Sequence, residues 1–413
     1  SFLMSNTIYN ICIVSPGILP IPDVLGGAVE RLITMIIQTN ELEHRFDITV
    51  ITVPNKNARL LQNSYRYTEF VNLDYYINPT IKKWVEKINW HLRTKFEREV
   101  HLWNNFLSPV SKYLCKNSQK FDFYVSECSN PLFCHNLSMI VGKNRIAVHL
   151  HGNLLASKKI EDTFGNVFAV SNFIRNQYYR NSNLSPDRIL TIFNGIDTKK
   201  FSQKLTIAEK IKLRESLGIN KEDFVLIFCG RIVKDKGVLE LINAFLSIHC
   251  NNVKLMILGS SNFGLGDFGS YPQRVKQLVD DNRNRIIFTG FVNNDDVYRY
   301  HQIADVGIMP SMHNDPCPLS MFELITSGLP TIATNAGGMP EIGTLETTIF
   351  VSMDNIEIEL KDAILRLYNN PIIRKKMHIA ALKRAEAFTQ LRFYNDFCDT
   401  VIKLIKKNDI PNK

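Results

Sequence analysis

The sequence lacks any run of about 18 or more uncharged apolar residues, the length that favours a membrane-spanning helix. It also lacks a CxxC pair, and two of its eight scattered cysteines, Cys12 and Cys229, lie inside apolar runs typical of buried strands. This pattern favours free thiols in a reducing compartment over disulfides or a zinc site, so we expect a cytoplasmic protein. The first loop has no GxGxxG fingerprint, which disfavours a dinucleotide cofactor. The residues before Met4 are too few for a signal peptide.

The size and charge of the chain narrow the class further. A length of 413 residues exceeds one ordinary domain core, so two domains are expected. There are 49 lysines and arginines against 40 acidic residues, and this basic balance favours an anionic ligand or an anionic membrane face. No recognised nucleic-acid-binding motif is present, so nucleic acid is not an expected partner.

Buried-strand patterns alternate with helical patterns along the chain, which predicts α/β domains with parallel sheets. The alternation restarts after the turn signal at 194–197, which places a domain boundary near residue 200. We therefore expect a first domain at 1–200, a second at 201–387, and a final helix at 388–413 that packs back across the junction. Strands are expected at 9–15, 47–53, 121–126, 145–150, 166–170, 190–193, 224–229, 253–258, 285–289, 305–309 and 330–334.

Residues 76–120 interrupt this alternation. Apolar residues recur from Ile81 to Leu107 at helical spacing, which predicts a long helix or a broken helical pair. The basic and aromatic side chains of this segment include Lys83, Lys87, Trp90 and Arg93. One hypothesis is that they meet an anionic membrane carrying a lipid-linked acceptor, and the alternative is an ordinary solvated helix face. Equal recovery in the supernatant with and without anionic liposomes would contradict the membrane hypothesis.

A basic turn follows the apolar run at 224–229. Gly230 and Arg231 come first, and Lys236 and Gly237 lead into a helical pattern. Fixed positive charge and free backbone N–H groups at a helix start suit a diphosphate. A solvated basic turn without a ligand is the alternative that this turn alone leaves open.

Two carboxylates follow the strand expected at 305–309. Asp315 falls on a loop, and Glu323 falls on a helix that starts around Leu319. Carboxylates near the carboxyl ends of parallel strands suit the binding of sugar hydroxyls. The alternative is that a surface acid and a helix acid never meet.

Two histidines end a strand of the first domain. His149 and His151 are two residues apart, so their side chains share one face of the strand and could form a metal pair. No carboxylate or third ligand lies near them in the sequence, and we therefore expect no metal site. For His149 a structural role in the core is the alternative.

Taken in order, these residues resemble the motifs of glycosyltransferase family 4, a retaining family with the GT-B fold. The matching segments are Gly26-Gly27-Ala28-Val29-Glu30, His151-Gly152, Val170-Ser171-Asn172, Asn194-Gly195-Ile196-Asp197, Gly230-Arg231 with Lys236-Gly237, Asp315 to Glu323, and Ala336-Gly337-Gly338-Met339-Pro340-Glu341. The resemblance implies two Rossmann-like α/β/α domains that face each other across a deep cleft. The acceptor side would be the first domain and the donor side the second.

The resemblance also implies the site residues. The expected catalytic residues are His151, Arg231, Lys236 and Asp315, and the donor site adds Gly26, Gly27, Leu319, Ser320 and Glu323. Arg231 and Lys236 would neutralise the diphosphate leaving group, and Glu323 would hold the ribose hydroxyls. The two glycines would approach the phosphates closely. His151 and Asp315 would contact the donor sugar; the family usually has glutamate in place of Asp315, which leaves the donor open.

The function implied is retaining transfer of a sugar from a nucleotide-diphospho-sugar, most simply a UDP-sugar, to a glycan or lipid-linked acceptor. Neither a metal ion nor another cofactor is expected, and no protein nucleophile is assigned. The alternatives are a nucleotide-sugar epimerase on the same fold and a non-catalytic binding subunit. The paired acids and the basic turn argue against the epimerase. The non-catalytic subunit is disfavoured because the expected site residues are present, namely His151, Arg231, Lys236 and Glu323.

Overall fold

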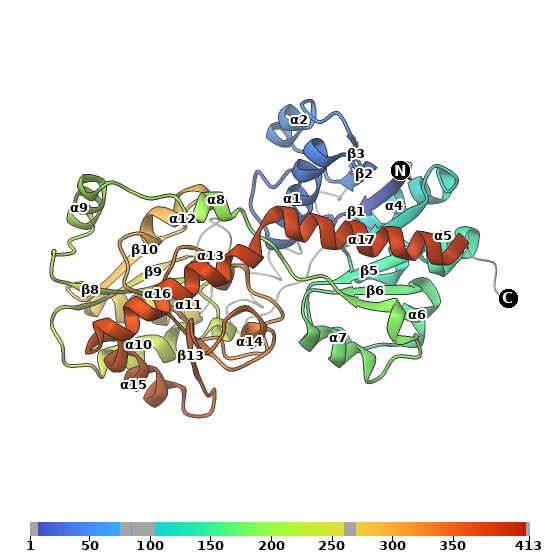
Figure 1. Ribbon diagram of the computed structural model, residues 1–413. Coiled ribbons are helices and arrows are strands. Elements are labelled where there is room, and N and C mark those ends of the chain that lie inside the picture. The colour runs from blue at the N-terminus through green and yellow to red at the C-terminus, as the bar shows by residue number, and fades with distance from the viewer. Residues whose placement is uncertain (1–6, 75–83, 85–103, 260–269, 410–413) are drawn as a thin grey trace, which may run out of the picture. The chain divides into compact units, whose positions relative to one another are not determined.

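The computed structural model of the protein describes residues 7–74, 84, 104–259 and 270–409. The chain divides into two compact units (Figure 1). Unit 1 contains the described residues up to Gly195 and those from Gln390 onward, and unit 2 runs from Ile196 to Thr389. Most of the basic, aromatic segment expected at 76–120 lies outside the described residues, including Lys83, Lys87, Trp90 and Arg93.

Unit 1 is built on a parallel sheet of seven strands in the order β3-β2-β1-β4-β5-β6-β7. Every residue of β4, β5 and β6 is buried, so both faces of the sheet are covered there. The strands are β1 Tyr9–Val14, β2 Phe46–Thr52, β3 Thr68–Asn72, β4 Phe123–Ser126, β5 Ile146–Leu150, β6 Asn166–Ala169 and β7 Ile189–Thr191.

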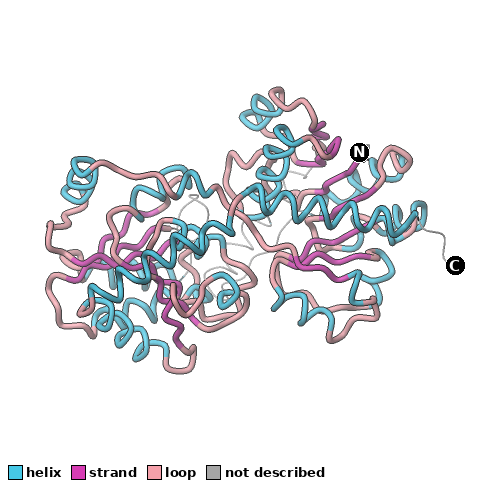
Figure 2. Tube along the Cα trace, in the orientation of Figure 1, coloured by secondary structure: helices cyan, strands magenta, loops and turns pink. Residues whose placement is uncertain are grey.

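The helices of unit 1 flank this sheet (Figure 2). They are α1 Ala28–Glu43, α2 Lys56–Gln62, α4 Asn104–Lys116, α5 His135–Val141, α6 Lys158–Thr163, α7 Asn172–Tyr179 and α17 Gln390–Asp409. The last helix, α17, belongs to unit 1 although it is remote in sequence. Its Tyr394 hydroxyl donates to Asn40 Oδ1 on α1 at 2.6 Å, and its Phe397 packs edge-on against Phe46 and Phe168. Buried aromatic packing therefore holds the end of the chain on the first sheet.

Unit 2 contains a six-stranded parallel sheet in the order β10-β9-β8-β11-β12-β13. Its strands are β8 Phe224–Cys229, β9 Val253–Leu258, β10 Ile286–Gly290, β11 Val306–Met309, β12 Thr331–Thr334 and β13 Thr348–Val351. Its helices are α8 Thr198–Phe201, α9 Ile207–Ser216, α10 Val238–Leu246, α11 Ser270–Asp281, α12 Asn294–His301, α13 Leu319–Thr326, α14 Met339–Ile342, α15 Ile356–Tyr368 and α16 Pro371–Ala385. A core of buried apolar side chains from β8, β9, α10 and α15 holds the unit together.

Each strand expected from the sequence is confirmed within two residues at either end. Two further strands, β3 and β13, were not predicted. Both lie at an edge of their sheet, and their burial is mixed, so neither presents the continuous apolar run of a central parallel strand.

The strand order reverses once in each sheet, at β1 and β4 in unit 1 and at β8 and β11 in unit 2. In open parallel sheets, ligands bind beyond the carboxyl ends of the strands at such switch points. The loops after β8 and β11, and those after β4 and β5, are therefore where we expect the site residues to lie.

None of the helices in the described part of the chain combines the length and hydropathy that crossing a membrane requires.

Candidate active site

The basic turn of unit 2 lies at its switch point, directly after the buried strand β8. Gly230 and the exposed Arg231 follow that strand, and Lys236 closes a short 3-10 turn. Gly237, at φ +70°, then starts α10. A Cβ atom on Gly237 would lie 1.8 Å from the carbonyl oxygen of Pro310, so glycine is required for the turn to lie against the loop that follows β11.

Lys236 and Asp315, which the sequence placed in separate motifs, form an ion pair. Lys236 Nζ lies 2.5 Å from Asp315 Oδ2, and the two side chains are 19% and 7% exposed. His313 Nε2 is 3.8 Å from the same carboxylate oxygen. Because an ammonium group has three donors, Lys236 can pair with Asp315 and still donate to a second acceptor. Removing either partner would leave the other charge largely desolvated.

Glu323 is held by a different neighbour. It is 5% exposed on α13, and its Oε1 accepts a hydrogen bond from Asn294 Nδ2 at 3.1 Å. Leu319, at the start of the same helix, is buried, and Ser320 Oγ lies 3.5 Å from the sulfur of Met309 at the end of β11. The structure thus brings all the residues expected for the donor site in unit 2 to the loops and helix starts around β8 and β11.

The loop at 336–341 packs directly on the loop that carries Asp315. The N–H of Gly338 donates to the carbonyl oxygen of Asp315 at 2.8 Å. A Cβ atom on Gly337, at φ +59°, would lie 2.2 Å from that same oxygen. This close approach fixes the backbone of the acid loop and explains why a glycine is needed at position 337.

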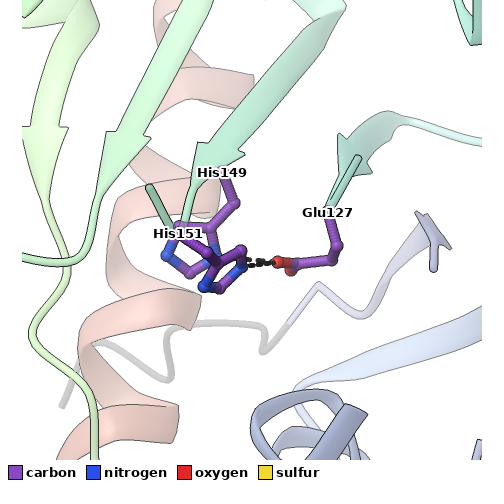
Figure 3. A group of neighbouring side chains, drawn as sticks. All are labelled: Glu127, His149 and His151. Carbon is purple, nitrogen blue, oxygen red and sulfur yellow. Dashed lines mark hydrogen bonds and ion pairs between the residues drawn. The ribbon is translucent and has the colours of Figure 1, made fainter. Parts of the chain in front are cut away.

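In unit 1 the two histidines share a carboxylate that the sequence analysis missed (Figure 3). Glu127 follows β4 directly, and its Oε2 lies 2.5 Å from His151 Nε2 and 3.0 Å from His149 Nδ1. The first contact is a hydrogen bond; the second has the distance of an ion pair without the angles of a hydrogen bond. The sequence has no carboxylate close to the histidines along the chain, and the fold supplies one from 24 residues away. The available signal was an acid placed immediately after a fully buried strand.

The charges of this group follow from its surroundings. Burial raises the pKa of Glu127, but His149 and the hydrogen bond from His151 outweigh it and bring the pKa to about 2, so the carboxylate is ionised. Burial and the neighbouring His149 lower the pKa of His151, against the opposing effect of Glu127. A neutral His151 that donates from Nε2 to Glu127 presents Nδ1 as an acceptor.

The glycine loop of unit 1 leads into α1. Gly27, at φ +96°, precedes the helix, and a Cβ atom there would lie 2.1 Å from Glu30 Oε2. Gly26 has φ +83° and open space around its Cα. Glu30 is 5% exposed, and burial, with the nearby charges of Asp23 and Glu127, raises its pKa to about 7. The glycine is thus needed for Glu30 to fold back over the start of its own helix.

Glu30→Gln is expected to stabilise the protein at pH 8 more than at pH 5. The pKa of the Glu30 carboxyl is about 7 in the folded protein and near 4.5 in the unfolded chain, so the free energy of unfolding of the wild type decreases as the pH rises through this window. The neutral amide of Glu30→Gln does not titrate and avoids this decrease. The gain in the free energy of unfolding from the substitution should therefore be about 1–3 kcal/mol larger at pH 8 than at pH 5. Urea unfolding at both pH values measures it. Glu43→Gln, at the exposed end of α1, is the control, and an equal effect of Glu30→Gln at both pH values would contradict the prediction.

Two α/β units with parallel sheets, each with polar side chains gathered at a switch point, define the GT-B fold. A glycosyltransferase from Rickettsia africae ESF-5 superposes with a TM-score of 0.76 over 97% of this chain and 99% of that one, at 18% identity. Anabaena Alr3699/HepE in complex with UDP-glucose gives a TM-score of 0.70 over 96% of this chain and all of that one, at 16% identity.

Sequence comparison points to the same class. Residues 209–384 match the family model described as glycosyl transferases group 1. The putative glycosyltransferase YtcC of Bacillus subtilis is 25% identical over 89% of this chain and 86% of its own length. The uncharacterized glycosyltransferase MJ1607 of Methanocaldococcus jannaschii is 31% identical, over 43% of this chain and 44% of its own. The alpha-monoglucosyldiacylglycerol synthase of Acholeplasma laidlawii is 28% identical over 52% of this chain and 49% of its own. These matches support a glycosyltransferase.

Proposed function

We propose that the protein is a retaining glycosyltransferase of family 4 that transfers a sugar from a nucleotide-diphospho-sugar, a UDP-sugar, to a glycan or lipid-linked acceptor. The observation that carries the proposal is the basic turn of Arg231 and Lys236, held against the Asp315 loop at the switch point of unit 2. The UDP-glucose complex of HepE and the glycolipid product named for the Acholeplasma relative are properties of those proteins, and they favour the same donor and acceptor classes here.

The role of unit 2 is to stabilise the departing nucleoside diphosphate. Negative charge grows on the phosphate oxygen as its bond to the anomeric carbon breaks, and the cations of Arg231 and Lys236 meet that charge without reorganising. The N–H groups at the start of α10 add to the effect. Glu323 accepts hydrogen bonds from the ribose hydroxyls, and Leu319 and Ser320 line the same side of the donor.

The resemblance to the family supports a contact of Asp315 with the donor sugar and, separately, a contact of His151, whose Nδ1 would accept from a sugar hydroxyl. Gly26 and Gly27 let the backbone approach the phosphates. The acceptor oxygen forms its bond to the anomeric carbon on the face that the diphosphate leaves, and its proton passes to a phosphate oxygen. Retention then needs no protein nucleophile, and the two cations take the place of a metal ion at the leaving group.

A panel of nucleotide-sugars tests the proposal in the presence of EDTA, with thermal shift and nucleotide release as readouts. One donor should raise the melting temperature and be slowly hydrolysed. If no donor binds, the presence of Asp315 in place of the family's glutamate becomes the leading explanation, and the alternative of a non-catalytic binding subunit is favoured. A donor that is altered without release of its nucleotide indicates an epimerase. Turnover that is lost in EDTA and restored by Mg²⁺ would contradict metal independence.

The proposal extends to the place of action. A cytoplasmic protein is consistent with its eight cysteines, none of which forms a disulfide in the described part of the chain. We further propose peripheral contact with the inner face of an anionic membrane through residues 76–120, which the liposome assay given above tests. A lipid-linked acceptor would then be presented at the surface to which the enzyme is bound.

A further inference from the structure

We propose that Glu127, His149 and His151 form a binding site for a divalent transition-metal ion such as Zn²⁺. Each of the three side chains offers one ligand atom, and these atoms all lie within 4.8 Å of one another. Two imidazoles and one carboxylate, with a further position open, are a donor set that Zn²⁺ accepts in proteins. In the described part of the chain no other group of three such side chains has this geometry.

The polar atoms of this group are poorly satisfied by the protein itself. Glu127 and His149 have side chains that are 2% and 1% exposed. Glu127 Oε1 and both ring nitrogens of His149 have no hydrogen-bond partner among the described residues. Buried polar atoms without partners destabilise a fold, so a ligand that binds them is favoured. A metal ion would bind the lone pairs of both side chains at once.

The sheet holds two of the three ligands in place. β4 pairs with β5 in parallel, with Ser126 opposite Val148, so the residues that follow, Glu127 and His149, are adjacent by register. His151 lies two residues further along the same face, and the two imidazole centroids are 4.3 Å apart (Figure 3). His151 is 15% exposed, so an ion and a fourth ligand can reach the group from its side.

Small side-chain movements are enough to complete the site. Ligand atoms around a tetrahedral Zn²⁺ lie about 3.3 Å apart, because each bond is about 2.0–2.1 Å long. The separation of Glu127 Oε2 from His149 Nδ1, 3.0 Å, is already close to that value. The 2.5 Å separation from His151 Nε2 must widen by less than about 1 Å. His151 follows the end of β5 and can rotate to do so.

A bound ion would also affect activity. It would take the imidazole of His151 that the proposed function gives to the donor sugar, so Zn²⁺ should inhibit transfer in competition with the donor. This consequence rests on the proposed function, whereas the binding of the ion does not. The two can therefore be tested separately.

Calorimetric titration with Zn²⁺ alone, on untagged protein stripped with EDTA, tests the site. We expect one ion per chain, and a tetrahedral visible absorption band when Co²⁺ is used in its place. Glu127→Gln, His149→Gln and His151→Gln should each weaken binding at least about tenfold. His44→Gln, which alters a histidine paired with Asp47 at the surface, should leave it unchanged. Absence of an ion in the wild type, or equal affinity in His151→Gln, would overturn the proposal.

Two further readouts keep the outcomes distinct. Circular dichroism checks the fold of the variants. His151→Gln is expected to disturb the fold least, because His151 is the most exposed of the three side chains. Donor turnover with increasing Zn²⁺ gives the inhibition. Zn²⁺ binding without any donor turnover would leave the metal site standing and contradict the proposed function. Turnover without Zn²⁺ binding would do the reverse.

Discussion

Lys236→Met is expected to lower the rate of sugar transfer by about 10²–10³-fold, the loss typical when one preorganised charge is removed from a developing anion. The side chain keeps its length and apolar stem but no longer offers a cation to the diphosphate. Nucleotide release at saturating donor measures the effect. The matched control is Lys234→Met, which removes an exposed cation from the same 3-10 turn and should change the rate less than about twofold.

Lys236→Met is also expected to lower the stability of the fold, and this effect must be distinguished from the loss of sugar transfer. The Lys236→Met chain retains Asp315, which is 7% exposed in its side chain and loses its partner at 2.5 Å. Breaking such a pair destabilises a fold by about 3–5 kcal/mol, whereas replacing both partners can be nearly neutral. The double variant Lys236→Met/Asp315→Asn should therefore recover the melting temperature and remain inactive. An active double variant would show that neither side chain serves the reaction.

Gly237→Ala is expected to destabilise unit 2 by about 3 kcal/mol or more. Alanine at φ +70° costs about 1–2 kcal/mol by itself. Its Cβ atom would also lie 1.8 Å from the Pro310 carbonyl oxygen, a backbone atom that moves only with the loop carrying Ser311 and Asp315. Thermal and urea unfolding of the variant measure the loss.

Gly290→Ala provides a control matched in backbone conformation. Gly290 has φ +71°, and a Cβ atom there would have no heavy atom within 4 Å. Alanine at this position should therefore show the conformational cost alone, about 1–2 kcal/mol. Equal losses in the two variants would mean that the approach of the turn to the β11 loop contributes nothing. The donor should also protect the wild type from unfolding more than it protects Gly237→Ala.

The central strands were predictable because a continuous apolar run within one strand is enough to indicate that the strand is buried. β8 and β9 have the bounds expected from their apolar runs, since a strand covered on both faces is almost entirely apolar; Lys254 of β9 is the one charged residue in these two strands. The edge strand β3 was not predictable in this way, because one buried threonine is followed by exposed and half-buried residues. An edge strand needs apolar side chains only where a neighbour covers it.

The candidate site was likewise predictable in part. Arg231, Lys236 and Glu323 were predictable as candidates from motif order, and each lies near a switch point. Their actual partners were not. Lys236 and Asp315 are 79 residues apart and were assigned different ligands, yet they bind each other. Glu127 was missed because it is 24 residues from His151 and part of no expected motif.

The amino-acid sequence by itself determined the α/β class, the positions of the central strands and the residue types at the ends of those strands. Each of these depends on the spacing of apolar, glycine and charged residues within a single element. Only the tertiary structure decided which side chains share a site. The order of strands in a parallel sheet is set by crossover connections, and so β4 lies between β1 and β5, bringing Glu127 to the two histidines. No local sequence pattern predicts the contact between Glu127 and the two histidines, because it forms only when the strands assemble into the sheet.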